Sequence, residues 1–195
     1  MLKKAVVLLA EGFEEVEAIT PIDYLRRAGI AVTIAAIGNA SGGVSVKGAR
    51  GISVQADATL QELVQRGEAA SWDAVVVPGG MPGASNLAAS PETGALLAGM
   101  AAAGKWVCAI CASPAVVLAP LGLLAGKQFT CYPGMETKAQ SGVWSDERVV
   151  VDANASGGGI ITSRGAGTAG EFAVAIIGQL LNEEAGTKIA QAVLL

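Results

Sequence analysis

Short, wholly apolar runs alternate with longer amphipathic segments along this chain, and that alternation constrains its fold more than any other feature. Because polar and apolar residues do not alternate within the runs, we expect strands that are buried on both faces of a sheet. The predicted strands are 5–9, 31–37, 74–77, 106–110, 149–151 and 160–162.

The segments between these runs are typical of helices, and several have Pro near the start or Gly just after the end. The predicted helices are 14–28, 59–66, 91–103, 114–118 and 169–181. Strand and helix in alternation predict an α/β fold with a doubly wound, mainly parallel sheet and helices on both faces. With 195 residues, 52% of them apolar, and no repeat or linker, the chain is expected to form a single domain over 1–195.

The formal net charge of −4 and the lack of a Lys/Arg cluster predict no binding to nucleic acid or to an anionic membrane. Small molecules or proteins are therefore the expected partners. Lys3 and Lys4 precede the apolar run 5–10 as in a signal peptide, but the run is too short and ends in an acidic stretch. It is also far below the roughly 20 apolar residues that span a bilayer. Because three cysteines are too few for a disulfide framework and their odd number fits a reducing compartment, we expect a cytoplasmic protein.

Cys111 lies where a doubly wound sheet binds its ligands, just beyond the carboxyl end of a strand. It follows the predicted strand 106–110, and Pro114 suits the first turn of the next helix. This arrangement is typical of a nucleophile elbow, in which the helix N-terminus favours thiolate over thiol. Burial as a small apolar residue is the alternative for Cys111.

Cys108 and Cys111 form a C-x-x-C motif, a spacing also found in redox and metal sites. Three residues of a strand cover about 10 Å, whereas a disulfide needs Cα atoms closer than about 7 Å. We therefore expect Cys108 to be a core residue, and we predict no metal site and no cofactor. The role of Cys131 stays open, with packing in the core or at the rim favoured.

The chain contains no histidine, so the usual base of cysteine enzymes is missing and another residue type must carry protons. At about 100° per residue, helix 14–28 turns Glu17 away from its polar face and toward apolar side chains. Glu17 is therefore the candidate carboxyl, and we expect it to be buried and neutral near pH 7. The dipole of the helix N-terminus is enough to explain Glu14 and Glu15.

Gly79 and Gly80 follow the predicted strand 74–77 and leave backbone N–H groups open to a ligand, as an oxyanion hole requires. An ordinary turn explains the same pair equally well. Residues 165–168, before the last long helix, have the composition of an anion-binding nest, but a tight turn is the favoured explanation.

Four short segments stand in order along the chain: 10–17 (AEGFEEVE), 77–80 (VPGG), 109–114 (AICASP) and 162–168 (TSRGAGT). Together they resemble the ThiJ/PfpI superfamily, and in particular its parkinsonism-associated deglycase branch, which includes bacterial ThiJ-like proteins. RRAGI at 26–30 and RGISVQAD at 50–57 also match, so the similarity spans nearly the whole chain.

This resemblance implies a flavodoxin-like homodimer with a nucleophilic, readily oxidised Cys111 and a protonated Glu17 hydrogen-bonded to it. Backbone amides of a glycine pair and of the residue after the cysteine would form an anion pocket with a basic rim. The resemblance places Gly79, Gly80 and Ala112 in the pocket, and Arg50 and, from the partner subunit, Arg27 at the rim.

Two positions depart from the relatives. The protease-like branch has His directly after its nucleophile, where this chain has Ala112, so we expect no peptidase activity. Some eukaryotic members have a His near the cysteine where this chain has Tyr132, so any role of that His is absent or passes to the phenol.

Members of this family are described as glutathione-independent glyoxalases, deglycases, redox-regulated chaperones and oxidative-stress sensors, which leaves two hypotheses. In the first, the Cys111 thiolate adds to a dicarbonyl such as methylglyoxal, and Glu17 moves the protons. In the second, the protein is a non-catalytic redox sensor or chaperone whose Cys111 is oxidised to a sulfinate.

Overall fold

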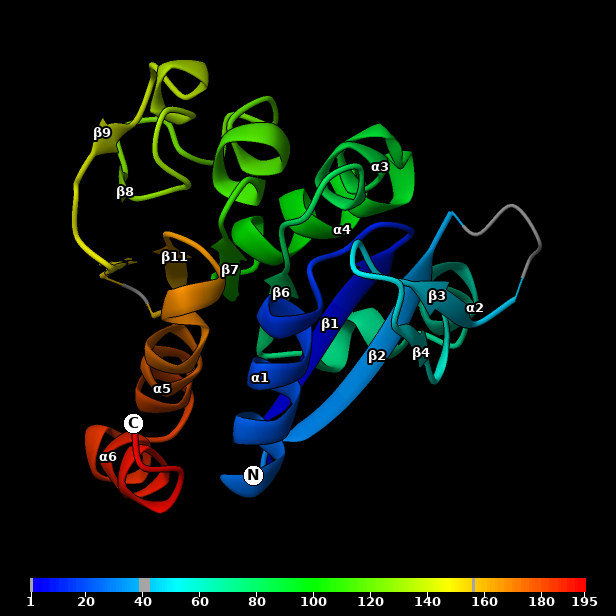
Figure 1. Ribbon diagram of the computed structural model, residues 1–195, viewed down its shortest axis with the longest axis horizontal. Coiled ribbons are helices and arrows are strands. Elements are labelled where there is room, and N and C mark those ends of the chain that lie inside the picture. The colour runs from blue at the N-terminus through cyan, green and yellow to red at the C-terminus, as the bar shows by residue number, and fades with distance from the viewer. Residues whose placement is uncertain (1, 39–42, 156) are drawn as a thin grey trace.

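A seven-stranded sheet forms the centre of the computed structural model, which describes residues 2–38, 43–155 and 157–195 (Figure 1). The strand order is β10-β11-β7-β6-β1-β2-β5. Neighbouring strands are parallel except for β10, which runs antiparallel to β11. The strands of this sheet are β1 (Lys4–Ala10), β2 (Ala31–Ile37), β5 (Ala58–Thr59), β6 (Ala74–Val77), β7 (Trp106–Ile110), β10 (Val149–Ala153) and β11 (Gly159–Ser163).

Helices cover both faces of the sheet, each over its own apolar cluster. One face carries α2 (Leu60–Gln65), α3 (Gly83–Ala89), α4 (Pro91–Ala102) and the π-helical turn η2 (Pro114–Leu118). The other face carries α1 (Glu15–Arg27), α5 (Ala169–Leu180) and α6 (Glu183–Ala192). None of the helices in the described ranges is long and apolar enough to cross a membrane.

The central strand β1 shows why its sequence lacks polar residues. Val6 and Leu8 pack into the cluster beneath α2 to α4, whereas Ala5, Val7 and Leu9 pack into the cluster beneath α1 and α5. All five side chains are fully buried, because successive residues of a strand point to opposite faces and both faces are covered. The doubly wound, mainly parallel sheet predicted from the apolar runs is therefore confirmed.

Capping residues set the starts of two predicted helices. The Thr59 hydroxyl accepts from the Glu62 amide at 3.2 Å while the Glu62 carboxylate accepts from the Thr59 amide at 2.9 Å, which is a capping box at the start of α2. Pro91 begins α4, and the Ser90 hydroxyl accepts from the Thr93 amide at 3.2 Å.

The structure differs from the prediction in its shorter elements. Residues 114–118 form a single π-helical turn rather than an α-helix, and α3 and α6 were not predicted. The remaining elements are β3 (Ser45–Lys47), β4 (Ser53–Gln55), η1 (Glu68–Ser71), β8 (Gln128–Phe129), η3 (Glu136–Lys138), β9 (Val143–Trp144) and η4 (Ala166–Thr168). Most of these segments carry too few residues for a hydrophobic period to show in the sequence, whereas α6 has ten residues and an amphipathic pattern that the sequence analysis missed.

Four neighbouring strands, β11, β7, β6 and β1, run parallel and end at the same edge of the sheet. The segments that follow them are 11–14, 78–82, 111–113 and 164–168. This shared edge brings together the loops that contain most of the candidate residues, as the rule for ligand sites in such sheets predicts.

Candidate active site

Cys111 occupies a strained turn directly after β7. Its φ is 64°, in the left-handed region that non-glycine residues rarely adopt and that costs about 1 to 3 kcal/mol. Neighbouring segments hold it there: its amide donates to the Ser163 carbonyl at 2.9 Å, and its carbonyl accepts from the Tyr132 amide at 2.8 Å. The conformation is that of a nucleophile elbow, with the half-buried thiol at the sheet edge.

Glu17, in the first turn of α1, lies against this thiol. Its side chain is 1% exposed, and its Oε2 accepts from the Gly79 amide at 2.9 Å. Burial raises the pKa of Glu17 to about 7, although hydrogen bonds from Cys111, Gly79 and Ala166 act to lower it. Near neutral pH this carboxyl therefore exists in both forms, as a residue that accepts and returns protons requires.

The thiol itself is not acidic while Glu17 is ionised. Burial first, and then the charge of Glu17, raises the pKa of Cys111 to about 12, whereas the amides of Ala112 and Gly80 act to lower it. This direction is opposite to our expectation that the helix N-terminus favours the thiolate. The stabilisation of the thiolate by one short π-helical turn is smaller than its destabilisation by burial and by the neighbouring carboxylate. The two groups titrate as a coupled pair, and protonation of Glu17 removes one of the two opposing effects.

The backbone amides of the glycine pair after β6 serve different residues, one Glu17 and the other Cys111. The Gly79 amide donates to Glu17, whereas the Gly80 amide, together with that of Ala112, is hydrogen-bonded to the Cys111 sulfur. A Cβ on Gly79 would lie 2.7 Å from both the Cys111 Cβ and the Glu17 Oε2, so no side chain fits there. Two of the three amides expected in the anion pocket therefore face the sulfur, and the third positions the carboxyl.

The candidate rim residues lie at different distances from the pair. Arg50 is 73% exposed in its side chain and reaches Glu14 at 3.5 Å. Arg27 lies at the other end of α1, about 15 Å along the helix from Glu17, where it pairs with Asp23 at 2.8 Å. Within one chain the structure therefore does not bring Arg27 to the site.

Tyr132 and residues 165–168 form the outer wall. Tyr132 is 52% exposed, and a Cβ on Gly165 would lie 3.6 Å from its ring and 3.9 Å from the Cys111 sulfur. Beyond them lies a cavity of about 330 Å³, also lined by Arg148 and Arg164. The Thr168 hydroxyl, which donates to the Gly165 carbonyl at 2.9 Å, closes the segment into a tight turn.

The other two cysteines are buried. Cys108 is fully buried in β7, which fits the core position expected for it, and burial raises the pKa of its thiol. Cys131 is 1% exposed and lies 3.5 Å from the Tyr132 carbonyl; burial and the charge of Glu136 raise its pKa to about 11. In the described ranges, side chains of His, Cys, Asp and Glu form no group of three that could hold a metal ion.

Two residues support the site in ways that the sequence analysis did not predict, and for Glu15 the helix dipole alone is not the explanation. Glu15 is buried, and its Oε1 accepts from the Arg50 amide at 2.7 Å and the Ile52 amide at 3.3 Å. Ser113 is fully buried and donates to the Pro78 carbonyl at 2.6 Å, joining the loop after β6 to the elbow. Neither had a distinctive signal, since one belongs to an acidic run and the other to a helix start.

Comparison with known proteins finds, over most of the chain, the family that the sequence motifs resemble. The model of the DJ-1/PfpI family matches residues 3–179. The chain is 37% identical over 190 residues to the Parkinson disease protein 7 homolog of Danio rerio, covering 96% of this chain and 94% of that protein. It is 36% identical over 185 residues to the glutathione-independent glyoxalase DJR-1.2 of Caenorhabditis elegans, covering 93% and 91%.

One relative is much longer than this chain, and a solved structure has a similar fold over nearly its whole length. Protein DJ-1 homolog B of Arabidopsis thaliana is 40% identical over 188 residues, which are 96% of this chain but only 40% of that longer protein. The crystal structure of a DJ-1 superfamily protein from Salmonella typhimurium is similar with a TM-score of 0.89 and 38% identity, covering 99% of this chain and 98% of that one. The sequence, the fold and the strand-end cysteine agree, and the chain belongs to the DJ-1/PfpI family.

Proposed function

We propose that this protein is a cysteine-dependent, glutathione-independent glyoxalase or deglycase that acts on methylglyoxal-type dicarbonyls or their adducts. The observation that carries the proposal is the hydrogen-bonded pair of Cys111 and Glu17, in which the buried carboxyl has a pKa of about 7. The similarity to a relative that is itself named a glutathione-independent glyoxalase supports it.

The geometry suits addition of the thiol to an aldehyde. Glu17 takes the proton of Cys111 as the sulfur attacks the aldehyde carbon of methylglyoxal, and the amides of Gly80 and Ala112 lie beside the oxyanion that forms. Glu17 returns that proton to the oxygen, which gives a hemithioacetal, and then removes the proton of the former aldehyde carbon while the ketone oxygen gains a proton, which gives an enediol. Glu17 delivers its proton to the adjacent carbon as the first hydroxyl loses its own, and a thioester results. Water cleaves the resulting thioester, which releases lactate and restores the thiol.

A redox sensor or redox-regulated chaperone is the second candidate, because the same pair suits an oxidised cysteine. Two equivalents of peroxide would convert the Cys111 thiol to a sulfinate with release of water. A protonated Glu17 could donate to one sulfinate oxygen, and the amides of Gly80 and Ala112 to the other. Sulfinate formation without dicarbonyl turnover would favour this function.

We further propose that the protein acts in the cytoplasm, in oxidative and carbonyl stress, with a small dicarbonyl or glycated molecule as its partner. The three cysteines are all free thiols, which fits a reducing compartment. No cofactor is required for the steps above, since Cys111, Glu17 and water supply every group that moves.

The test is lactate formation from methylglyoxal by metal-free protein without glutathione. We expect Cys111→Ala to lower kcat/KM at least about 1000-fold, because covalent addition is lost. Cys131→Ala, which removes a buried thiol outside the Cys111–Glu17 pair, should stay within about threefold of the wild type. Substantial turnover by folded Cys111→Ala would exclude covalent catalysis at this thiol.

A further inference from the structure

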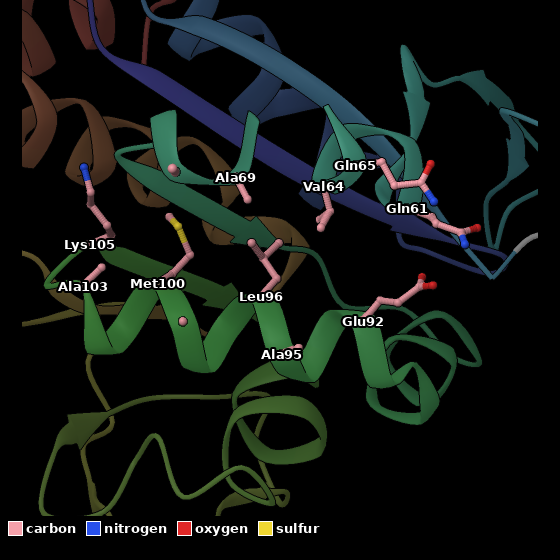
Figure 2. Close-up of a pocket in the computed structure, with 12 residues that line it drawn as sticks. Gln61, Val64, Gln65, Ala69, Glu92, Ala95, Leu96, Met100, Ala103 and Lys105 are labelled. Carbon is pink, nitrogen blue, oxygen red and sulfur yellow. The ribbon is translucent and has the colours of Figure 1, made fainter. Parts of the chain in front are cut away.

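A second cavity, of about 490 Å³, lies apart from the Cys111 site, between α4 on one side and α2 and η1 on the other (Figure 2). Leu96 and Met100 of α4, with exposures of 8% and 4%, form its apolar floor, and Val64 of α2 faces them. Its volume lies within the range of small-molecule sites, about 300 to 1000 Å³. Neither the candidate catalytic pair nor the residues around it line this cavity.

The two ends of the cavity differ in charge. Figure 2 shows Lys105 at one end and Glu92 at the other, with Leu96 and Met100 between them. The Lys105 ammonium lies 3.5 Å from Asp73, and Lys3 lies 3.6 Å from the same carboxylate. Because two ammonium groups share one carboxylate, the Lys105 end keeps a net positive charge.

The shape of the cavity favours a single extended chain. The lining residues of α4 and its C-cap run from Glu92 to Ala103, a distance of about 16 Å along the helix axis. A volume of about 490 Å³ over that length leaves a cross-section too narrow for a helix, which is about 10 Å across with its side chains. An unbranched alkyl chain fits such a cross-section.

We propose that this cavity binds a medium-chain fatty acid, with the alkyl chain along Leu96 and Met100 and the carboxylate at Lys105. Binding of the alkyl chain removes the apolar surface of the floor from contact with water, and this favours association. The carboxylate gains the uncompensated positive charge at one end and avoids Glu92 at the other. The site is independent of the proposed dicarbonyl chemistry.

Titration calorimetry with decanoate, kept below its aggregation concentration, tests the proposal, and decanol serves as the uncharged probe. Gly99 lines the cavity, and Gly99→Leu should reduce its free volume, because a Cβ at Gly99 meets no atom within 4 Å. Gly178→Leu is its control, because a Cβ on Gly178, in α5, also meets no atom within 4 Å. We expect saturable binding of one decanoate, weakened at least tenfold by Gly99→Leu and unchanged by Gly178→Leu.

The charge is tested separately. Lys105→Gln should weaken decanoate at least fivefold and change decanol less than twofold. Lys3→Gln, which removes the other cation on Asp73 but does not line the cavity, should have the smaller effect. Thermal unfolding checks each variant, and Ala95→Leu replaces Gly99→Leu if the latter does not fold.

Three results would overturn the proposal. They are no saturable decanoate binding by the wild type, equal binding by the filled variant, and equal loss of decanoate and decanol in Lys105→Gln. If the wild type binds no decanoate and light scattering shows a changed oligomeric state for Gly99→Leu, the cavity is instead a contact surface for a second copy of the chain.

Discussion

At the scale of single residues, the chemistry depends on one carboxyl that is held away from water. Glu17 is 1% exposed, and burial dominates over three hydrogen bonds in setting its pKa to about 7. Its ordinary pKa is 4.5, so the native protein binds a proton in a range where the unfolded chain has lost it. The property that suits Glu17 to proton transfer therefore also affects folding stability.

Replacing Glu17 by Gln should expose this linkage. Below pH 4.5 the carboxyl is protonated in both states, and as pH rises through about 7 the native state loses up to about 3 kcal/mol relative to the unfolded chain. Since Gln stays neutral, the free energy of unfolding of Glu17→Gln relative to that of the wild type should increase from pH 4.5 to pH 8. Urea unfolding of both proteins at pH 4.5 and at pH 8 measures this change.

The same variant separates proton transfer from structure. Turnover of methylglyoxal by Glu17→Gln should fall at least about 100-fold, because the transferable proton is lost. The pKa of Cys111, followed by thiolate absorbance, should fall, because the neighbouring carboxylate is gone. Wild-type turnover by Glu17→Gln would make Glu17 a structural carboxyl.

At the scale of elements, the site depends on how the β3–β4 hairpin is joined to α1. Glu15 makes that connection through the amides of Arg50 and Ile52, with one oxygen serving both. The contact places Arg50 within 3.5 Å of Glu14, close to the first turn of the helix that carries Glu17. A buried carboxylate thus positions the hairpin next to the candidate active site.

We expect Glu15→Ala to loosen the hairpin. Two amides lose their acceptor, which should lower the free energy of unfolding by about 2 to 4 kcal/mol and speed hydrogen exchange at Arg50 and Ile52. Glu15→Gln keeps a carbonyl acceptor and should show a smaller effect on both measurements. Unchanged exchange at these two amides in Glu15→Ala would show that other contacts hold the hairpin.

At the scale of the whole molecule, α1 and the hairpin expose three large apolar side chains. Val16, Ile19 and Ile52 are 48%, 40% and 59% exposed, and the contacts of Glu15 bring their elements together. Clusters of this kind mark association surfaces, and we propose that this one forms the homodimer. We further propose that Arg27, which is far from the site within one chain, serves the partner's site in this homodimer, as the family resemblance implies.

Light scattering at micromolar concentration should give twice the chain mass of 19.4 kDa. Ile52→Glu should shift the protein toward monomer, because a charge replaces an apolar contact at the proposed interface. Val143→Glu is the matched control, since Val143 is 57% exposed on β9, and it should leave the mass unchanged. A wild-type monomer would contradict the proposed interface.

The sequence by itself determined the sheet, its main helices and the place of Cys111, because each depends on a local pattern. A strand with a fully apolar run such as 5–9 is buried on both sides, which requires a sheet covered on both faces, and a cysteine that follows such a strand lies at the sheet edge. The burial of Glu17 also followed from its angular position on the helix.

Only the tertiary structure determined which group each of these residues contacts and how the pKa of Cys111 shifts. The amides of Gly79 and Gly80 serve different partners, Glu15 holds a hairpin, and the pKa of Cys111 rises instead of falling. Each outcome depends on contacts between segments far apart in the chain, such as the 62 residues that separate Glu17 from Gly79. Desolvation and hydrogen bonding act through such contacts, and no pattern within one segment encodes them.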